Sequence, residues 1–280
     1  MLSAAELKSV LRARGLRLTK RLGQHHLIDA RSIERVADAA GLARTERVVE
    51  IGAGLGALTE ALARRACRVV AVEVDTGICA VLAERMAAYA NVTVACRDIL
   101  TYRPEELREA VVVGAIPYHI TSDVLVWLCE ARGQVRRAVL VVQREVGRRL
   151  AASPGSKAYG RLSLLAQYSW QVRELFAIGR HAFFPEPEVD SVCLSLTPVT
   201  AVAAAADEAL LFAVIKAAFG QRRKTLANSL SADPALAIPR AAAEAVVRSL
   251  GWSGSVRGET LTLAEFVRLT DALAQEKHLP

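Results

Sequence analysis

A strand, a glycine-rich turn and a helix follow one another near the start of the chain, and this order suits nucleotide chemistry. Residues 48–51 are rich in β-branched side chains and predict a strand, while residues 57–65 have the pattern of a helix. Between them lie three glycines, Gly52, Gly54 and Gly56. Because glycine lacks a Cβ atom, the backbone N–H groups of this turn can approach a nucleotide-like ligand closely.

Carboxylates follow the glycine turn at the ends of the next two predicted strands. Glu73 comes directly after residues 68–72, and Asp98 follows residues 92–96. Glu73 lies about 20 residues beyond the glycines, where a carboxylate can bind the two hydroxyls of a ribose. The glycine spacing is G-x-G-x-G and not the G-x-G-x-x-G of a dinucleotide site. The pattern therefore indicates a cleft for S-adenosylmethionine, and the alternative is an ordinary βαβ turn without a ligand.

A second motif, G-A-I-P-Y-H at residues 114–119, ends the strand predicted for residues 111–116. Ligands of open α/β sheets bind beyond the carboxyl ends of the strands, so this turn should face the same cleft. Pro117 fixes its own φ and holds Ile116 in an extended conformation, which makes a stiff turn that presents backbone carbonyls. Tyr118 then offers a flat aromatic face to a base.

The predicted elements define an α/β fold. Strand-like runs alternate with helical stretches, which predicts a mainly parallel sheet with helices on both faces. Two further strands lack a long helix between them and predict an antiparallel edge. Beyond an Ala-rich linker the remaining chain has a helical pattern, which predicts a first domain of residues 1–198 and a second of 199–280. The predicted strands are residues 48–51, 68–72, 92–96, 111–116, 138–143, 171–176 and 191–196.

Composition narrows the class of protein. The chain has 280 residues, of which 52% are hydrophobic and 23% charged, so it is globular and not disordered. No apolar run approaches the roughly 18 residues of a membrane helix. The N-terminus lacks the order of a signal peptide, and Ser3 and Glu6 fit a capping box that starts an amphipathic helix. We expect a cytoplasmic protein without a membrane partner; an Arg-rich organelle transit peptide is the alternative for this helix.

Cysteine and histidine spacing gives no sign of a metal site. The two adjacent histidines have no cysteine or acid at zinc spacing nearby, and no metal is expected. Single cysteines scattered through an intracellular chain predict reduced thiols, in preference to a disulfide. The five cysteines are Cys67, Cys79, Cys96, Cys129 and Cys193.

The net charge of +7 is concentrated in three basic clusters. Such clusters suggest a polyanionic partner, most economically a nucleic acid, although a solvated basic face explains any one of them. The first comprises Lys8, Arg12, Arg14, Arg17, Lys20 and Arg21; the second Arg132, Arg136, Arg137, Arg144, Arg148 and Arg149; the third Arg222, Arg223 and Lys224.

Several blocks of sequence resemble one family. Residues 114–118 resemble the N-[LI]-P-Y motif of amino-group methyltransferases, and residues 20–27 resemble a K-R-x-G-Q-N-F-L motif. From Lys20 to Phe266 the chain resembles the small-subunit (16S-type) rRNA adenine N6,N6-dimethyltransferases. Antibiotic-resistance methyltransferases of large-subunit rRNA share the front half, but the Q-R-R-K-T-L block favours the small-subunit branch. The further matching blocks are P-G-S-K-A-Y-G-R-L-S at 154–163, F-F-P-E-P-E-V-D-S at 183–191 and F-G-Q-R-R-K-T-L-A-N-S-L at 219–230.

The resemblance implies a Rossmann-like S-adenosylmethionine-dependent methyltransferase sheet with a small C-terminal helical domain. It implies dimethylation of two adjacent adenines in a hairpin loop of small-subunit rRNA, with the pre-ribosomal small subunit as the partner. We expect the protein to be a monomer. It places the catalytic site at Ala115, Pro117, Tyr118 and Phe184, the last as the second aromatic face. The implied cofactor-binding residues are Gln24, His25, Leu27, Gly52, Gly54, Glu73, Asp98 and Ala115, and the implied RNA-binding residues Lys20, Arg21, Arg222, Arg223 and Lys224.

The chain departs from the family pattern at the residue that matters most. Ala115 stands where the motif has Asn, whose side-chain oxygen accepts a hydrogen of the target amine. An engineered inactive form, a naturally weakened homologue, or an active enzyme in which Thr121 or His119 substitutes would each explain it. A non-catalytic RNA-binding assembly factor is the alternative function. The other departures are His25-His26 for Asn-Phe, Glu188 for Lys and Ala227 for Arg.

Overall fold

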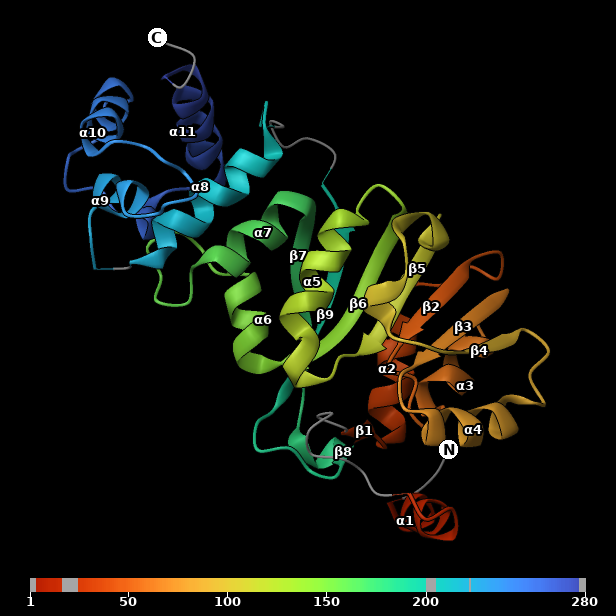
Figure 1. Ribbon diagram of the computed structural model, residues 1–280. Helices are drawn as coiled ribbons and strands as arrows, with labels where there is room; N and C mark the ends of the chain where they lie inside the picture. The colour runs from red at the N-terminus through yellow and green to blue at the C-terminus, as the bar shows by residue number, and fades with distance from the viewer. Residues whose placement is uncertain (1–3, 17–24, 200–204, 222, 277–280) are drawn as a thin grey trace. The chain divides into compact units, whose positions relative to one another are not determined.

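The computed structural model describes residues 4–16, 25–199, 205–221 and 223–276 (Figure 1). The chain forms two compact units: Met1–Gly147 with Trp170–Pro198, and Arg148–Ser169 with Val199–Pro280.

A seven-stranded sheet with the order β4-β3-β2-β5-β6-β9-β7 forms the first unit. Neighbouring strands from β4 to β6 pair in parallel, whereas β9 pairs antiparallel with both β6 and β7. The predicted α/β class and antiparallel edge are therefore confirmed. The strands are β2 (Arg47–Ile51), β3 (Arg68–Glu73), β4 (Val92–Cys96), β5 (Ala110–Ala115), β6 (Val135–Gln143), β7 (Trp170–Ile178) and β9 (Ser191–Pro198).

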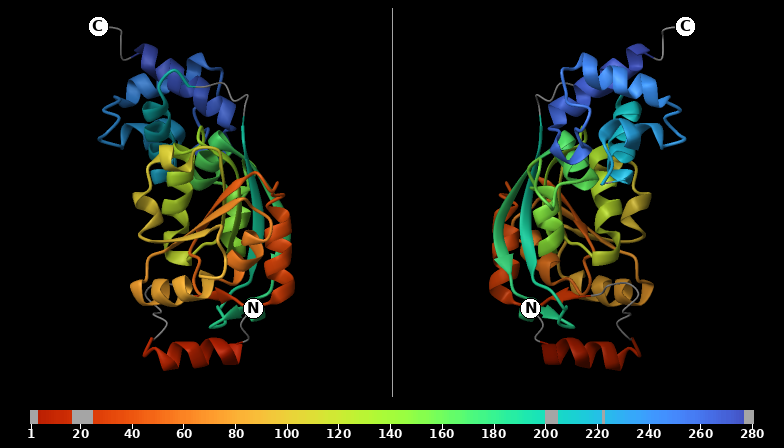
Figure 2. Two further views of the ribbon diagram at one scale, coloured as in Figure 1. Left: turned by 90° about the vertical axis from the view of Figure 1, so that its right-hand side faces the viewer. Right: turned by 90° about the vertical axis from the view of Figure 1, so that its left-hand side faces the viewer.

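Helices cover both faces of this sheet (Figure 2). On one face α2 (Ala30–Ala39) and α3 (Ala57–Ala63) bury Ile33 and Leu62 against valines of β2, β3, β5 and β6. Next to them α4 (Thr76–Met86) buries Leu82 and Met86 against β3. On the opposite face lies α5 (Thr121–Glu130), whose Val124 and Leu128 are fully buried. The strand ends that carry the predicted motifs are thus held between two layers of helix.

The N-terminal helix α1 (Ala4–Ala13) confirms the predicted amphipathic helix, although Ser3 of its predicted cap lies outside the described residues. Its Leu7 and Leu11 are buried against Ile78 of α4. A separate two-stranded sheet joins β1 (His26–Leu27) to β8 (Phe183–Phe184), which brings two distant motifs together. Short 3-10 turns complete the unit: η2 (Ile99–Thr101), η3 (Pro104–Leu107), η4 (Tyr118–Ile120) and η5 (Arg180–Ala182).

The second unit is helical, as predicted, but it also contains residues 148–169, which the sequence pattern assigns to the first domain. Tyr159 explains this grouping, because its buried ring packs edge-on against Phe219, which stacks on Phe266, and its hydroxyl donates to the Leu261 carbonyl at 2.8 Å. The helices are α6 (Arg144–Leu150, at the boundary), α7 (Arg161–Ser169), α8 (Glu208–Gly220), α9 (Leu226–Ser231), α10 (Arg240–Ser249) and α11 (Leu263–Glu276), with the turn η6 (Gly258–Thr260).

A disulfide corrects the cysteine prediction. The structure joins Cys79 and Cys96, whose Cα atoms are 5.8 Å apart, so the expectation of five reduced thiols is wrong for this pair. Cys79 lies in the first turn of α4 and Cys96 ends β4, and the parallel pairing of β3 and β4 brings these ends together. Their 17-residue separation matches no spacing motif, so the sequence held no signal. Cys67, Cys129 and Cys193 form no disulfide in the part of the chain that the structure describes.

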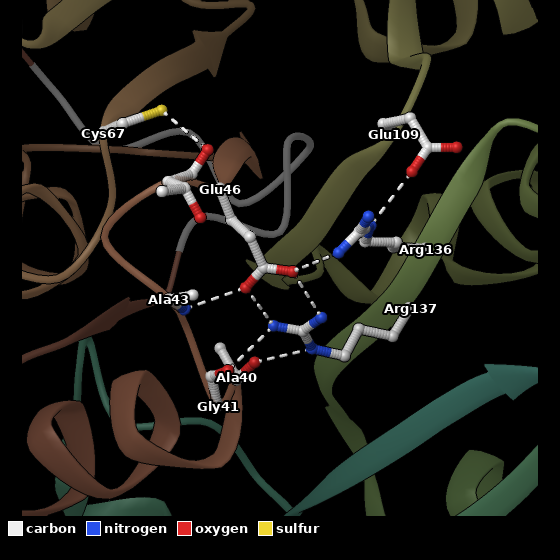
Figure 3. Close-up of polar contacts among 9 residues, drawn as sticks. Ala40, Gly41, Ala43, Glu46, Cys67, Glu109, Arg136 and Arg137 are labelled. Atoms are coloured by element: carbon white, nitrogen blue, oxygen red, sulfur yellow. Dashed lines mark hydrogen bonds and ion pairs between the residues drawn. The ribbon is translucent and has the colours of Figure 1, made fainter.

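At the opposite, amino-terminal ends of the strands, Glu46 joins three elements (Figure 3). Its carboxylate is 9% exposed and accepts hydrogen bonds of 2.7 and 2.8 Å from the Arg137 guanidinium. Arg137 also donates to the carbonyls of Ala40 and Gly41 at the end of α2, and Arg136 pairs with both Glu46 and Glu109. Two arginines of the second basic cluster therefore stabilise the fold by pairing with Glu46.

Replacing Glu46 by Gln should lower the free energy of unfolding by about 2 kcal/mol. This lies between the losses typical of breaking an exposed ion pair and a buried one. The Arg137 hydrogen bond lowers the pKa of Glu46 to about 2. Because the folded pKa is depressed, the stabilisation is present above the ordinary carboxyl pKa and is lost as pH falls toward 2. Urea unfolding of both forms at pH 7 and pH 3 measures this. Equal stability of the two forms at pH 7 would contradict it.

Candidate functional site

A cavity of about 200 Å³ opens where β2, β3 and β5 end. It gathers residues that lie far apart in the sequence, which is the arrangement expected for a ligand site at the carboxyl edge of an α/β sheet. The predicted site residues on its wall are His25, Gly52, Gly54, Glu73, Asp98, Ala115 and Pro117.

The glycine turn has backbone conformations that only glycine adopts without strain. Gly52, Gly54 and Gly56 have φ values of +68°, +55° and +86°. A Cβ on Gly54 would lie 2.4 Å from Nδ1 of His26, so a side chain has no room there. At Gly52 the nearest atom to such a Cβ is the Ala115 carbonyl oxygen, at 3.5 Å. The turn therefore lies between His26 on one side and the Ala115 motif on the other.

Backbone N–H groups fix the Glu73 carboxylate at the cavity wall. Oε2 accepts from Gly54 N at 2.9 Å, while Oε1 accepts from Val74 N at 2.9 Å and from Asp75 N at 3.1 Å. The side chain is 8% exposed, and burial raises its pKa. Since each carboxylate oxygen can accept two hydrogen bonds, Oε2 keeps a second acceptor position to which a ribose hydroxyl can donate.

Asp98 occupies the neighbouring strand end. One of its carboxylate oxygens accepts from Leu100 N at 3.0 Å and so caps η2. Next to it Arg97 also lines the cavity, stacked 3.7 Å from the ring centroid of Tyr102 and paired with Glu106. Sequence reasoning missed Arg97, because nothing in its spacing separates it from the other exposed arginines.

The Ala115 motif is held as stiffly as the sequence predicts. Ile116 N donates to the Val141 carbonyl at 2.9 Å, and the Pro117 carbonyl accepts from the Thr121 hydroxyl at 3.2 Å. Thr121 is therefore engaged away from the cavity wall, while His119 lies on that wall. Of the two neighbours considered as substitutes for the missing Asn, only His119 contacts the cavity. Tyr118 begins η4, but its side chain lies outside the described residues.

Among the residues whose side chains the structure describes, Phe183 lines the cavity and the predicted Phe184 does not. Phe184 packs against α1, with Nζ of Lys8 5.1 Å from its ring centroid. Successive side chains of a strand point to opposite faces, so only the register of β8 on β1 distinguishes the two rings. Phe183 therefore replaces Phe184 as the candidate for the ring that stacks on the second face of the base.

The remaining predicted residues are placed as follows. His25 Nδ1 lies 2.7 Å from the Pro185 carbonyl oxygen, and Leu27 lines a smaller adjoining cavity. Arg223 and Lys224 are exposed on the turn between α8 and α9. Gln24, Lys20, Arg21 and Arg222 lie outside the described residues.

Glu50, buried behind the glycine turn, accepts a 2.6 Å hydrogen bond from the Thr59 hydroxyl. Burial raises its pKa to about 8. Because the folded pKa lies above that of the unfolded chain, ionisation of Glu50 should destabilise the fold as pH rises through the window from about 4.5 to 8.

Glu50→Gln should therefore gain stability relative to the parent between pH 5 and pH 8, by at least about 2 kcal/mol. Urea unfolding of both proteins at the two pH values measures the change, and the amide preserves the acceptor for Thr59. A stability difference that is the same at pH 5 and pH 8 would show that Glu50 does not titrate in this window.

The described residues contain neither a membrane span nor a metal cluster. No helix among them is long and apolar enough to cross a membrane. No group of three or more His, Cys, Asp or Glu in the same part of the chain could hold a metal ion.

Comparison with known proteins identifies the family. The model of the family described as "Ribosomal RNA adenine dimethylase" matches residues 15–269. The chain belongs to this family. A relative from Bacillus mycoides named "Ribosomal RNA small subunit methyltransferase A" is 39% identical over 283 residues, covering 96% of each chain. The predicted family and its methyltransferase chemistry, with S-adenosylmethionine as methyl donor, are confirmed.

Solved structures agree with the fold. A dimethyladenosine transferase from Plasmodium falciparum is 24% identical with a TM-score of 0.76, covering 88% of this chain and 96% of that one. The 23S rRNA methyltransferase ErmE is 28% identical with a TM-score of 0.66, covering 89% and 99%. The predicted Rossmann-like methyltransferase sheet is thus confirmed.

The cavity fits S-adenosylmethionine. The oriented carboxylate of Glu73 suits the ribose, the open backbone at Gly52 suits the amino-acid portion, and Asp98 lies on the same wall. When bound, this cofactor supplies an electrophilic methyl group. The residues of this chain that line the cavity are placed to contribute binding and orientation.

Proposed function

We propose that this chain dimethylates N6 of two adjacent adenines in a hairpin loop of small-subunit rRNA, at a rate weakened by Ala115. The observation that carries this proposal is the Ala115-Ile116-Pro117 turn, which shares a cavity wall with Gly52 and Glu73. The 39% identical relative, named as a small-subunit rRNA methyltransferase, supports the substrate. We propose further that the protein is a cytoplasmic monomer acting on the pre-ribosomal small subunit.

The chemistry suits a base drawn out of a loop. Extruding a partly unstacked base costs only a few kcal/mol, and Tyr118 and Phe183 are the proposed stacking partners. The exocyclic amine is a poor nucleophile, because its lone pair is delocalised into the ring. Two hydrogen-bond acceptors on the amine would draw the nitrogen toward tetrahedral geometry and direct its lone pair. The backbone carbonyls of the motif supply one acceptor. The side chain of Ala115 has no oxygen and cannot supply the other.

A non-catalytic RNA-binding factor in small-subunit assembly is the second candidate, and Ala115 is the observation that favours it. Incubation of purified protein with radiolabelled cofactor and unmodified small-subunit particles separates the two. Measurable transfer of label by the parent supports the enzyme. Transfer only after Ala115→Asn substitution would assign the parent to the non-catalytic class. The absence of transfer from both proteins would contradict the proposed substrate.

RNA binding should depend on Arg222, Arg223 and Lys224. Removing one phosphate-binding side chain should reduce the slope of log affinity against log salt by roughly one unit. The triple Ala variant should therefore bind small-subunit particles more weakly and with a flatter salt dependence, while its cofactor affinity is unchanged. Filter binding across a salt series measures the affinity for the particles and its salt dependence, and calorimetry measures the cofactor affinity.

A matched control removes charge elsewhere in the second unit. Lys216 and Arg268 are exposed on α8 and α11, and their Ala variants should leave the salt slope close to that of the parent. If the triple variant has the parent's slope, the RNA contacts lie elsewhere. Arg144 and Arg148 of the second basic cluster would then be the next candidates, since Arg136 and Arg137 are ion-paired with Glu46.

A further inference from the structure

The disulfide between Cys79 and Cys96 lies directly beside the cofactor cavity. Two segments of the cavity wall are residues 72–74, at the end of β3, and residues 97–99, which follow β4. Cys96 immediately precedes the second segment, and Sγ of Cys79 lies 3.3 Å from the carbonyl oxygen of Glu73 in the first. The cross-link therefore ties together two parts of the cavity wall that lie about 25 residues apart in the sequence.

The end of β4 depends on this cross-link more than the ends of the central strands do. β4 is the edge strand of the seven-stranded sheet and pairs with β3, whereas β2 and β5 each have a neighbour on both sides. At this end of the sheet Cys96 is the register partner of Glu73. Without the disulfide, the segment that carries Asp98 should be less firmly held relative to Glu73. A site that must be ordered when its ligand binds has a lower affinity than one that is already ordered.

The position of the two sulfurs suits reversible chemistry. Cys96 is exposed and can exchange with a thiol in solution, whereas Cys79 is buried. A thiol at Cys79 can donate a hydrogen bond to the nearby Glu73 carbonyl, while a disulfide sulfur has no hydrogen to donate. The buried sulfur therefore has a partner in both redox states. Disulfides are rare in the reducing cytoplasm, the location proposed above, and those found there are usually transient and redox-sensing.

We propose that Cys79 and Cys96 form a reversible thiol–disulfide switch that sets the affinity of the chain for S-adenosylmethionine. The oxidant is a low-molecular-weight disulfide, which reacts in two exchange steps. The Cys96 thiolate attacks one sulfur of this disulfide, forms a mixed disulfide and releases one small thiolate. The Cys79 thiolate then attacks Sγ of Cys96, closes the protein disulfide and releases the second small thiolate. The two cysteines are oxidised, the small disulfide is reduced to two thiols, and the protons of the cysteines end on these thiols.

Isothermal calorimetry of the oxidised and the reduced protein tests the switch. Reduction should weaken the binding of S-adenosylmethionine about tenfold, within the range of roughly 5–150-fold that is typical of two coupled sites. By thermodynamic linkage, saturating cofactor must raise the equilibrium constant for disulfide formation by the same factor. That constant is measured in mixtures of reduced and oxidised glutathione, with the free thiols counted by alkylation and mass spectrometry. A disulfide that holds the fold together without coupling to the cavity would give neither change.

Cys96→Ser and Cys67→Ser are the matched variants. Cys96→Ser should bind the cofactor as weakly as the reduced parent does, whether oxidant is present or not. Cys67 is exposed but outside the disulfide, so Cys67→Ser should respond to reduction as the parent does.

Affinities of the oxidised and the reduced parent that agree within about twofold would overturn the proposal, because two coupled sites should differ by more. An equilibrium constant for disulfide formation that the cofactor leaves unchanged would overturn it as well. If circular dichroism shows that the reduced chain is unfolded, the disulfide is only a structural cross-link and the proposal also fails. None of these measurements uses RNA, so their outcome is separate from that of the methylation assay.

Discussion

Replacing Ala115 by Asn should raise the initial rate of methyl transfer to small-subunit particles about 100-fold, as expected when one preorganised hydrogen-bonding group is restored. Ala115 lies at the end of β5, on the cavity wall, with its carbonyl facing Gly52. The turn that follows is already fixed by the hydrogen bonds of Ile116 and Pro117. The substitution therefore adds an acceptor to an ordered turn and requires no rearrangement of it.

The matched control is Ala115→Leu, which adds volume at the same position without an acceptor and should not accelerate transfer. Cofactor affinity, measured by calorimetry, should change less than the rate in the Asn form. If the parent already works at the rate of the Asn form, then the clamp on the amine is complete without residue 115, and the proposed weakening is wrong.

Glu73→Ala should weaken the binding of S-adenosylmethionine at least tenfold. Hydrogen bonds to a charged group contribute roughly 1.5–3 kcal/mol, and the removed carboxylate would accept from the ribose. Its loss also leaves the N–H groups of Gly54, Val74 and Asp75 without their acceptor. Isothermal calorimetry of the parent and the variant measures the change.

Glu84→Gln provides the comparison for Glu73. Glu84 belongs to α4 and pairs with Arg14, outside the cavity, so its loss of charge should leave cofactor affinity within threefold of the parent. Equal affinity of the parent and Glu73→Ala would remove Glu73 from the site, and the carboxylate would then serve only to hold the glycine turn.

Much of the fold was predictable, because hydrophobic period and strand-end motifs are local signals. The β-branched runs around Val48, Val111 and Val139 are buried on both faces of the sheet, and such strands stand out in the sequence. The antiparallel edge formed by β7 and β9 was predictable because no long helix separates these two strands. Positions of the glycine turn and of Glu73 followed as well, since the topology fixes where parallel strands end.

Predictions that depended on packing between distant segments were less successful. Phe183 and Phe184 are chemically identical, and only pairing of β8 with β1 decides which ring faces the cavity. Tyr159 draws residues 148–169 into the helical unit by packing against Phe219, about 60 residues later in the sequence. The Cys79–Cys96 disulfide likewise depends on the adjacency of β3 and β4.

Basic clusters were the least informative signal. Arg136 and Arg137 lie in a run of arginines that suggested RNA, yet both are ion-paired with Glu46. A charge count does not distinguish an arginine that neutralises a buried carboxylate from one that is available to a phosphate. Only the position of the acidic partner in the fold makes this distinction.

Mapping of the methylated nucleotides distinguishes the proposed activity from every other methyl transfer to rRNA. Small-subunit particles that lack the modification are incubated with the cofactor and the Ala115→Asn form or the parent, and nuclease fragments of the rRNA are analysed by mass spectrometry. We expect N6,N6-dimethylation of two adjacent adenines in one hairpin loop, with faster accumulation by the Asn form. Methylation at other positions, or of large-subunit rRNA in preference to small-subunit rRNA, would contradict it.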